Sequence, residues 1–361
     1  MEAVQQLTTE SLIERTFASL IGAMELCSIH LGDELGFYRL LADEGPANSA
    51  KMARLAGTNE RYTREWLEQQ AVSGFIAADD QPDNALRKYS LPDAFRDLFC
   101  DPVSPIGIVP MASIFVGAIS PFARLADAFR TGNGISYADY GAVMHHAQAA
   151  FNRPQFHHQL ATEWLTAMPD VVEKLRSPNG SRVADIGMGQ GWSSIGIARE
   201  FPNARIDGFD LDEASVVSAN VNAREAGLSD RVVFQARDAG DPGLAGAYDF
   251  ALAIECVHDM SDPVAVLGAM RRLVGPGGTV LVVDEKVADA FTAPGSDVER
   301  LMYGFSVLHC LPVGMAEQPS VGTGTIIRER IMRDYVTAAG YEQVEILPIE
   351  HDFFRFYRLT A

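Results

Sequence analysis

The hydrophobic pattern of the first hundred residues is typical of helices followed by a hairpin. Apolar side chains between residues 8 and 30 recur at spacings of three and four, which predicts a long amphipathic helix. Three shorter helices are expected after it, with Ser49 and Asn59 as N-caps of the last two. Two short strands within 75–92 complete the order of elements in a winged helix.

The second half of the chain has a different pattern. From residue 181, short apolar runs alternate with segments long enough for helices, and Gly or Pro turns separate them. This is the pattern of a parallel sheet with crossover connections. The last two runs, 344–349 and 353–359, are joined by only three residues, which predicts an antiparallel hairpin at the sheet edge. We therefore predict an α/β half that follows a mostly helical half.

Between these halves, residues 101–178 are expected to form a helical connector that is interrupted near Pro154 and lines a cleft. The stretch from Pro102 to Ala123 carries no charge and is long enough to suggest a membrane span. It contains four prolines, however, which favours a buried connector. The predicted division is therefore 1–100, 101–178 and 179–361.

The net charge of the chain limits the kinds of molecule that it is expected to bind. The 361 residues include 29 basic and 48 acidic side chains, a net charge of −19. A field of this sign repels nucleic acid and anionic membranes, so a small molecule is the expected partner. Residues 1–100 hold nine basic and 16 acidic side chains, which argues against DNA binding by the winged helix. Its apolar first helix favours a homodimer interface or a cover for the substrate instead.

Cysteine and histidine spacing gives no sign of a metal site. The four cysteines lie far apart and form neither a disulfide framework nor a zinc motif, and no secretory signal peptide is apparent in the first residues. Both features favour the cytoplasm. The doublets at 145–146 and 157–158 lack the three- or four-residue spacing of helical metal ligands, so no metal is expected.

A glycine-rich turn follows the first strand of the α/β half. The strand ends at Asp185, and glycines occupy positions 187, 189 and 191 before a helix. Glycines at such a turn let a ligand approach the backbone, and the helix N-terminus favours an anionic group. A dinucleotide fingerprint would need its third glycine where Trp192 stands, which argues against a nicotinamide cofactor.

Polar side chains also follow the next three strands. Asp210 ends the second strand, Asp238 and Ala239 end the third, and Ile254 to Asp259 end the fourth. The carboxyl ends of parallel strands meet at one edge of the sheet, so these groups are expected to face one ligand. Asp210 is suited to accept hydrogen bonds from both hydroxyls of a ribose, and Asp238 from an exocyclic amine such as that of adenine.

These motifs carry a resemblance to a known family. The pattern D-x-G-x-G-x-G, then FDLD, RD-A and HDMSDP, resembles motifs I to IV of class I S-adenosylmethionine-dependent methyltransferases. With the winged-helix half, the chain is similar to two-domain bacterial and plant small-molecule O-methyltransferases, in particular to a bacterial branch. The resemblance implies a Rossmann-like seven-stranded methyltransferase sheet, S-adenosyl-L-methionine as cofactor, and an N-terminal domain that dimerises and covers the substrate.

The resemblance also implies roles for single residues. The glycines would pack against the methionine part of the cofactor, and Asp185 would orient the loop or contact the ammonium group through water. Leu211 would flank the adenine, and the Ala239 backbone would contact the ring edge. The expected cofactor-binding set is Asp185, Gly187, Gly189, Gly191, Asp210, Leu211, Asp238, Ala239 and Ile254.

His258 is the candidate catalytic residue. In HDMSDP it occupies the position of the base in the HDWSDE motif of plant-type O-methyltransferases, although Met260 replaces the tryptophan. The resemblance implies that a carboxylate orients it, and Asp284 matches that position better than Glu285. The alternative is a capping histidine that never touches substrate. Substrate contacts are expected from His157, His158, Trp164 and His309.

Two functions remain open at this stage. The first is a small-molecule methyltransferase, most simply acting on a hydroxyl oxygen, because an imidazole is matched in pKa to the deprotonation of a phenol. The second is a sensor or regulator that binds the cofactor through the α/β half without methyl transfer. The scarcity of basic residues in the winged helix favours the first.

Overall fold

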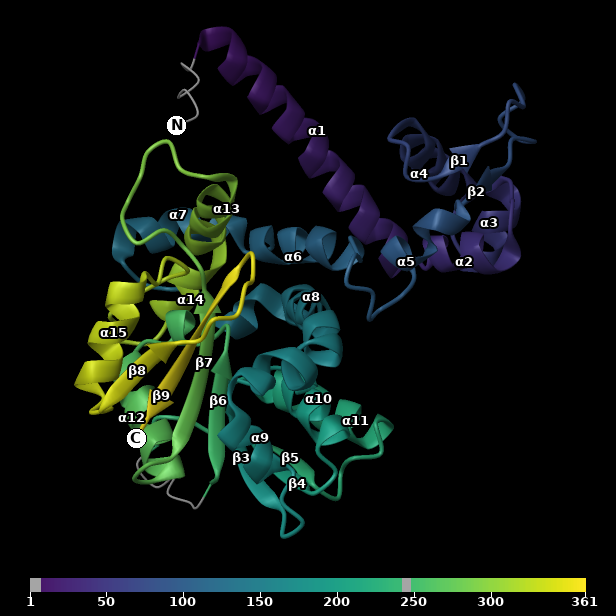
Figure 1. The fold of residues 1–361 in the computed structure, drawn as a ribbon. Helices are drawn as coiled ribbons and strands as arrows, with labels where there is room; N and C mark the ends of the chain where they lie inside the picture. The colour runs from purple at the N-terminus through teal and green to yellow at the C-terminus, as the bar shows by residue number, and fades with distance from the viewer. Residues whose placement is uncertain (1–7, 242–247) are drawn as a thin grey trace. The chain divides into compact units, whose positions relative to one another are not determined.

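The computed structural model describes residues 8–241 and 248–361. The chain forms two compact units, Met1–Gly117 and Ala118–Ala361 (Figure 1). The predicted combination of a helical N-terminal region and a seven-stranded α/β sheet is confirmed.

The N-terminal unit consists of helices and one small hairpin. In order, its elements are α1 (Thr9–Glu34), α2 (Phe37–Glu44), α3 (Ser49–Ala56), α4 (Glu60–Val72), β1 (Ala77–Ala78), β2 (Tyr89–Ser90), η1 (Asp93–Phe95), α5 (Arg96–Phe99) and α6 (Val109–Ile119), which continues past the boundary. Asn59 caps α4 as predicted. The predicted cap Ser49 is wrong, because the Asn48 side chain accepts the Lys51 N–H and Ser49 is already helical.

Only the end of α1 packs into the core of this unit. The Trp66 indole N–H donates to the Ser28 carbonyl at 2.9 Å, and Ile29 is buried beside it. The preceding turns of α1 extend beyond the α2–α5 cluster (Figure 1). Their large apolar side chains are exposed, and Phe17 and Met24 are each more than half exposed.

The second unit begins with a helical segment. It contains α7 (Phe122–Thr131), α8 (Tyr137–His158), a π-helical turn η2 (Leu160–Trp164), η3 (Leu165–Ala167) and α9 (Pro169–Leu175). The predicted interruption at Pro154 is wrong, because Pro154 lies inside α8. The backbone breaks at Gly141 instead, where φ is 75°, a conformation that glycine adopts without steric cost.

The uncharged stretch forms two helices rather than one. Among the described residues no single helix is long and apolar enough to cross a membrane. Helices α6 and α7 reach that length only together, and a bend of 53° separates them.

Seven strands form one mixed sheet in the order β5-β4-β3-β6-β7-β9-β8. The strands are β3 (Ser181–Ile186), β4 (Ala204–Asp210), β5 (Val232–Ala236), β6 (Phe250–Ile254), β7 (Thr279–Glu285), β8 (Gln343–Ile346) and β9 (Phe354–Thr360). Strands β3 to β7 run parallel, whereas β9 is antiparallel to both β7 and β8. The predicted final hairpin is therefore present, with β8 at the edge.

Helices connect the strands and cover both faces of the sheet. They are α10 (Trp192–Glu200), α11 (Glu213–Glu225), η4 (Val257–Asp259), α12 (Pro263–Val274), α13 (Asp297–Phe305), the π-helical turn η5 (Ser306–Cys310), α14 (Leu311–Gly314) and α15 (Glu329–Ala338). One hydrophobic cluster joins the sheet to α9, α10 and α11, and a second joins it to α12 and α15. All seven residues of β7 are buried, as expected for a central strand covered on both faces.

Candidate active site

A cavity lies at the carboxyl ends of the parallel strands. Its volume is about 610 Å³, and its walls come from the segments that follow β3, β4, β5 and β6 and from one side of α8. This volume is within the range of small-molecule sites. Its position is the one where open α/β sheets bind ligands, because the loops there leave the sheet in different directions.

The glycine turn forms one wall. Gly187 and Gly189 line the cavity, and both have positive φ. A Cβ on Gly189 would meet no atom within 4 Å, so the backbone is open to a ligand there. Gly191 is not among the described residues of the wall; a Cβ on it would lie 2.4 Å from the Phe234 ring, so its role is close packing between the turn and β5.

Asp210 is fixed by the backbone around it. Its Oδ2 accepts the Gly189 N–H at 2.8 Å, and its Oδ1 accepts the Asp212 N–H at 2.9 Å. Burial raises the pKa of Asp210, and these hydrogen bonds oppose the shift. Each carboxylate oxygen keeps a further lone pair, so the group can still accept hydrogen bonds from a ligand. Leu211, which is 59% exposed, lines the cavity next to it.

The third and fourth strand ends complete the expected cofactor surface. Asp238, Ala239 and Ile254 all line the cavity. Asp238 Oδ1 accepts the Gly240 N–H at 2.7 Å, which orients the carboxylate. Apart from Gly191, the structure therefore places every residue of the predicted cofactor-binding set on one cavity.

Asp185 is held by two hydroxyl groups of the protein. Its Oδ2 accepts hydrogen bonds from the Ser193 and Ser194 hydroxyl groups, each at 2.6 Å, and the side chain is 1% exposed. Burial raises the pKa of Asp185 to about 6, and the two hydroxyl groups oppose the shift. The carboxylate thus ties the first turn of α10 to the end of β3.

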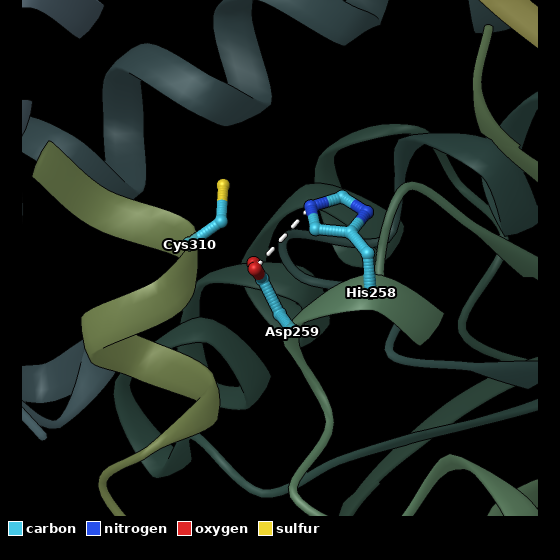
Figure 2. A group of neighbouring side chains, drawn as sticks. All are labelled: His258, Asp259 and Cys310. Atoms are coloured by element: carbon cyan, nitrogen blue, oxygen red, sulfur yellow. Dashed lines mark ion pairs between the residues drawn. The ribbon is translucent and has the colours of Figure 1, made fainter. Parts of the chain in front are cut away.

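His258 lies between two carboxylates. Its Nδ1 is 2.6 Å from Asp284 Oδ1, and its Nε2 is 3.2 Å from Asp259 Oδ1. Figure 2 shows the Asp259 carboxylate and the Cys310 sulfur on the same side as Nε2, and the three donor atoms lie within 4.8 Å of one another. Asp259 lines the cavity, but His258, only 3% exposed, is not among the described lining residues.

The charges around His258 favour its protonated form. Burial alone would lower the pKa of His258, but the negative charges of Asp259 and Asp284 outweigh burial and raise it well above the ordinary value. Burial raises the pKa of Asp259 to about 6, and His258 opposes that shift. Burial also raises the pKa of the Cys310 thiol to about 12. The group can therefore hold and move a proton; a histidine, a carboxylate and a cysteine are also ligands that zinc takes.

The predicted substrate residues lie elsewhere. Trp164 is 1% exposed and packs against Phe356 in the core, with the ring centroids 5.0 Å apart. His157 and His158 are exposed at the end of α8. His309 is buried against the Tyr140 ring, and burial lowers its pKa to about 3. None of the four belongs to the described cavity wall, so the expectation that His157, His158 and Trp164 face the cleft is wrong.

A different face of α8 lines the cavity. Beyond the break at Gly141, its described lining residues are His145, Gln148, Ala149, Asn152 and Phe156. These residues are related by spacings of three and four, which place them on one face of a helix. This signal is present in the sequence, but the prediction chose the histidines at the end of the helix instead. Glu255, directly after β6, also lines the cavity; it belongs to the predicted strand-end segment, but the prediction gave it no role of its own.

Two families match the chain. Residues 177–318 match the methyltransferase domain family, and residues 23–97 match the Rv2258c-like winged HTH domain family. The 27-O-demethylrifamycin SV methyltransferase of Amycolatopsis mediterranei is 32% identical over 123 residues, which are 34% of this chain and 45% of that protein. The chain thus matches less than half the length of this curated relative.

Solved structures match over nearly the whole chain. An O-methyltransferase family protein from Burkholderia thailandensis has a TM-score of 0.68 at 16% identity, covering 99% of both chains. Human N-acetylserotonin methyltransferase, solved in complex with S-adenosylmethionine, has a TM-score of 0.65 at 17% identity, also covering 99% of both chains. At these identities the likeness establishes the fold. The chain therefore carries a methyltransferase domain behind an N-terminal winged helix-turn-helix domain.

Proposed function

We propose that this protein transfers a methyl group from S-adenosyl-L-methionine to a hydroxyl oxygen of a small molecule. The observation that carries the proposal is the single cavity lined by the glycine turn, Asp210 and Asp238. Asp210 offers acceptor lone pairs for ribose hydroxyls, and Asp238 offers them for the adenine amine. Leu211, Ala239 and Ile254 supply apolar surface for the ring.

When bound, the cofactor supplies a methyl group on a sulfonium centre. The chain's part is to align the acceptor for an in-line displacement and to keep water out. Phe156 and Met260 give the cavity wall apolar surface, and His145 and Gln148 give it polar groups. We propose that the acceptor binds on this side of the cavity.

We propose that His258 takes the proton of the acceptor hydroxyl, with Asp284 orienting the imidazole. Nε2 of His258 is next to the Asp259 carboxylate. A hydroxyl of the acceptor that binds beside this carboxylate would therefore be separated from His258 by a single hydrogen bond. Only the neutral imidazole accepts a proton, and its raised pKa means that the neutral form becomes populated as the pH rises. We retain His309 as a lesser candidate for substrate binding, because it is adjacent to Cys310.

We also propose that the protein is a homodimer. On α1, Ile13, Phe17 and Met24 are each more than 60% exposed and lie at helical spacings on one face. A second copy of the same helix would cover this face. On α4, arginines pair with glutamates, Arg61 with Glu65 and Arg64 with Glu60, which leaves little positive charge for nucleic acid. The four free cysteines favour the cytoplasm.

Titration calorimetry followed by a transfer assay tests the proposal. S-Adenosylhomocysteine should bind in the micromolar range, and NAD should give no heat. Labelled methyl groups from the cofactor should then appear on one class in a panel of phenols, alcohols, amines and thiols. Binding of NAD without binding of S-adenosylhomocysteine would overturn the cofactor assignment. Tight cofactor binding without transfer to any acceptor would favour a sensor.

A further inference from the structure

We propose that Glu255, assisted by Asn152, binds the ammonium group of the cofactor's amino-acid part. This inference rests on the proposed function. The resemblance left two roles for Asp185, orienting the loop or contacting the ammonium group through water. The two serine hydroxyls of α10 that bind its Oδ2 favour the first role. Glu255 stands on the same cavity and is open to a new partner.

The backbone places Glu255 beside the glycine turn. It follows β6, its N–H donates to the Val283 carbonyl at 2.8 Å, and a Cβ on Gly187 would lie 2.7 Å from the sulfur of the next residue, Cys256. Glu255 has φ of 53°, the one positive φ among the described non-glycine residues. A side chain in this conformation is strained, and such strain occurs mainly at functional sites.

Two buried acceptor oxygens lie at this point. Glu255 Oε2 and Asn152 Oδ1 have no hydrogen-bond partner within the described residues. The Asn152 side chain is 8% exposed and hydrogen-bonds to Glu255. Unpartnered buried acceptors are costly, so they call for a ligand with several donors. An alkylammonium group has three N–H donors and no acceptor, which fits two oxygens that accept and one carboxylate that neutralises its charge.

The charges near Glu255 support a cationic ligand. Burial raises the pKa of Glu255 to about 7, and the positive charge of His258 and the Asn152 hydrogen bond oppose the shift. The other charged groups that act on it are Asp259, Asp284 and Glu285. With three acidic neighbours and one imidazolium, an added positive charge would stabilise the ionised carboxylate. Affinity for an ammonium ligand should therefore increase as the pH rises through about 7.

Calorimetry with two ligands tests the proposal. S-Adenosylhomocysteine has the amino-acid group, whereas 5′-deoxy-5′-methylthioadenosine has the same nucleoside and sulfur without it. We expect Glu255→Gln to weaken S-adenosylhomocysteine binding about 10- to 100-fold, the loss of one charged hydrogen bond. Binding of methylthioadenosine should stay within about threefold. Asn152→Ala should lose less affinity for S-adenosylhomocysteine and should likewise keep its affinity for methylthioadenosine. This variant provides the test if Glu255→Gln does not fold.

Glu285→Gln is the matched control, because this buried carboxyl group neighbours Glu255 but is not among the described residues of the cavity wall. At pH 8, where Glu255 is ionised with or without this neighbour, it should leave both affinities unchanged. The wild-type affinity for S-adenosylhomocysteine should rise between pH 6 and 8, and Glu255→Gln should remove most of that rise.

Three results would overturn the assignment. An equal loss of affinity for both ligands in Glu255→Gln would show that Glu255 has a structural role. Unchanged binding of both would place the ammonium elsewhere, and a raised KM for the methyl acceptor alone would assign Glu255 to that substrate. Absence of binding of either ligand to the wild-type protein would instead overturn the proposed function itself.

Discussion

Asp284 Oδ1 lies 2.6 Å from Nδ1 of His258, and both side chains are buried. A carboxylate only accepts hydrogen bonds, so the Nδ1–H of His258 donates to it, and Nε2 is left to face Asp259. The same Asp284 oxygen accepts the Glu285 N–H at 2.9 Å, which ties the pair to the end of β7. The contact thus selects the tautomer whose free nitrogen can take a proton from the cavity side.

Replacement of His258 tests proton transfer. We expect His258→Ala to lower turnover by about 10²- to 10⁴-fold, the typical contribution of a general base. Cofactor affinity should stay within about threefold of the wild-type value, because His258 is not among the described residues of the cavity wall. Single-turnover methyl transfer and calorimetry measure the two quantities. The loss should shrink at high pH, where the acceptor hydroxyl ionises unaided.

Two outcomes would remove His258 from proton transfer. Turnover within about threefold of the wild-type rate, on an acceptor whose hydroxyl pKa is well above the assay pH, would leave alignment alone as the source of catalysis. Loss of wild-type activity on treatment with a chelator, restored by zinc, would instead make His258, Asp259 and Cys310 a metal centre (Figure 2).

The pH dependence of kcat should reflect the protonation state of His258. Its pKa is raised well above the ordinary value, so kcat at saturating cofactor should rise with pH above neutrality as the imidazole loses its proton. Asp259→Asn removes one of the negative charges that raise this pKa. The rise in kcat should therefore move to lower pH in that variant, whatever its maximal rate.

Asp238→Asn is the control for this pH shift, because Asp238 lines the cavity but is not among the groups that act on His258. The pH at which its kcat rises should match that of the wild-type protein, whatever its maximal rate. A profile that stays in place when Asp259 is changed would show that another group limits kcat.

Asp210 tests the cofactor site. Asp210→Ala should weaken S-adenosylhomocysteine binding by about 1.5–3 kcal/mol, the scale for hydrogen bonds to a charged group. Part of this loss would come from the glycine turn, since Asp210 also accepts the Gly189 N–H. Asp207→Ala, on the same strand but paired with Arg182 at 2.6 Å, should leave binding unchanged. An unaltered dissociation constant for Asp210→Ala would exclude the carboxylate from the site.

The apolar face of α1 tests the dimer. We expect Phe17→Glu combined with Met24→Glu to produce monomers in light scattering, because four charges would face one another across a two-fold interface. The melting temperature of the winged helix core should change little, since both side chains are more than 60% exposed. Tyr62→Glu, on an exposed position of α4, is the control. A double variant that remains dimeric would place the interface on another surface.

The sequence by itself was sufficient for the features that depend on short stretches of backbone. A strand followed by glycines with positive φ fixes a ligand-accessible turn, and Asp210, Asp238 and Ile254 come to the same edge because parallel strands end together. The family resemblance paired Asp284 with His258, and strand order accounts for the contact, since each residue lies within four positions of the end of a neighbouring strand. These relationships are local or follow from strand order.

Only the tertiary structure decided which side of each helix meets the cavity. The rotation of α8 about its axis depends on its packing against α10, so Asn152 and His145 line the cavity while His157 and His158 are exposed. Pro154 likewise lies within the part of α8 that follows the break at Gly141, and Trp164 lies in the core. The tertiary structure also holds Glu255 in a conformation that local propensity disfavours, because the strain is compensated by contacts with distant segments.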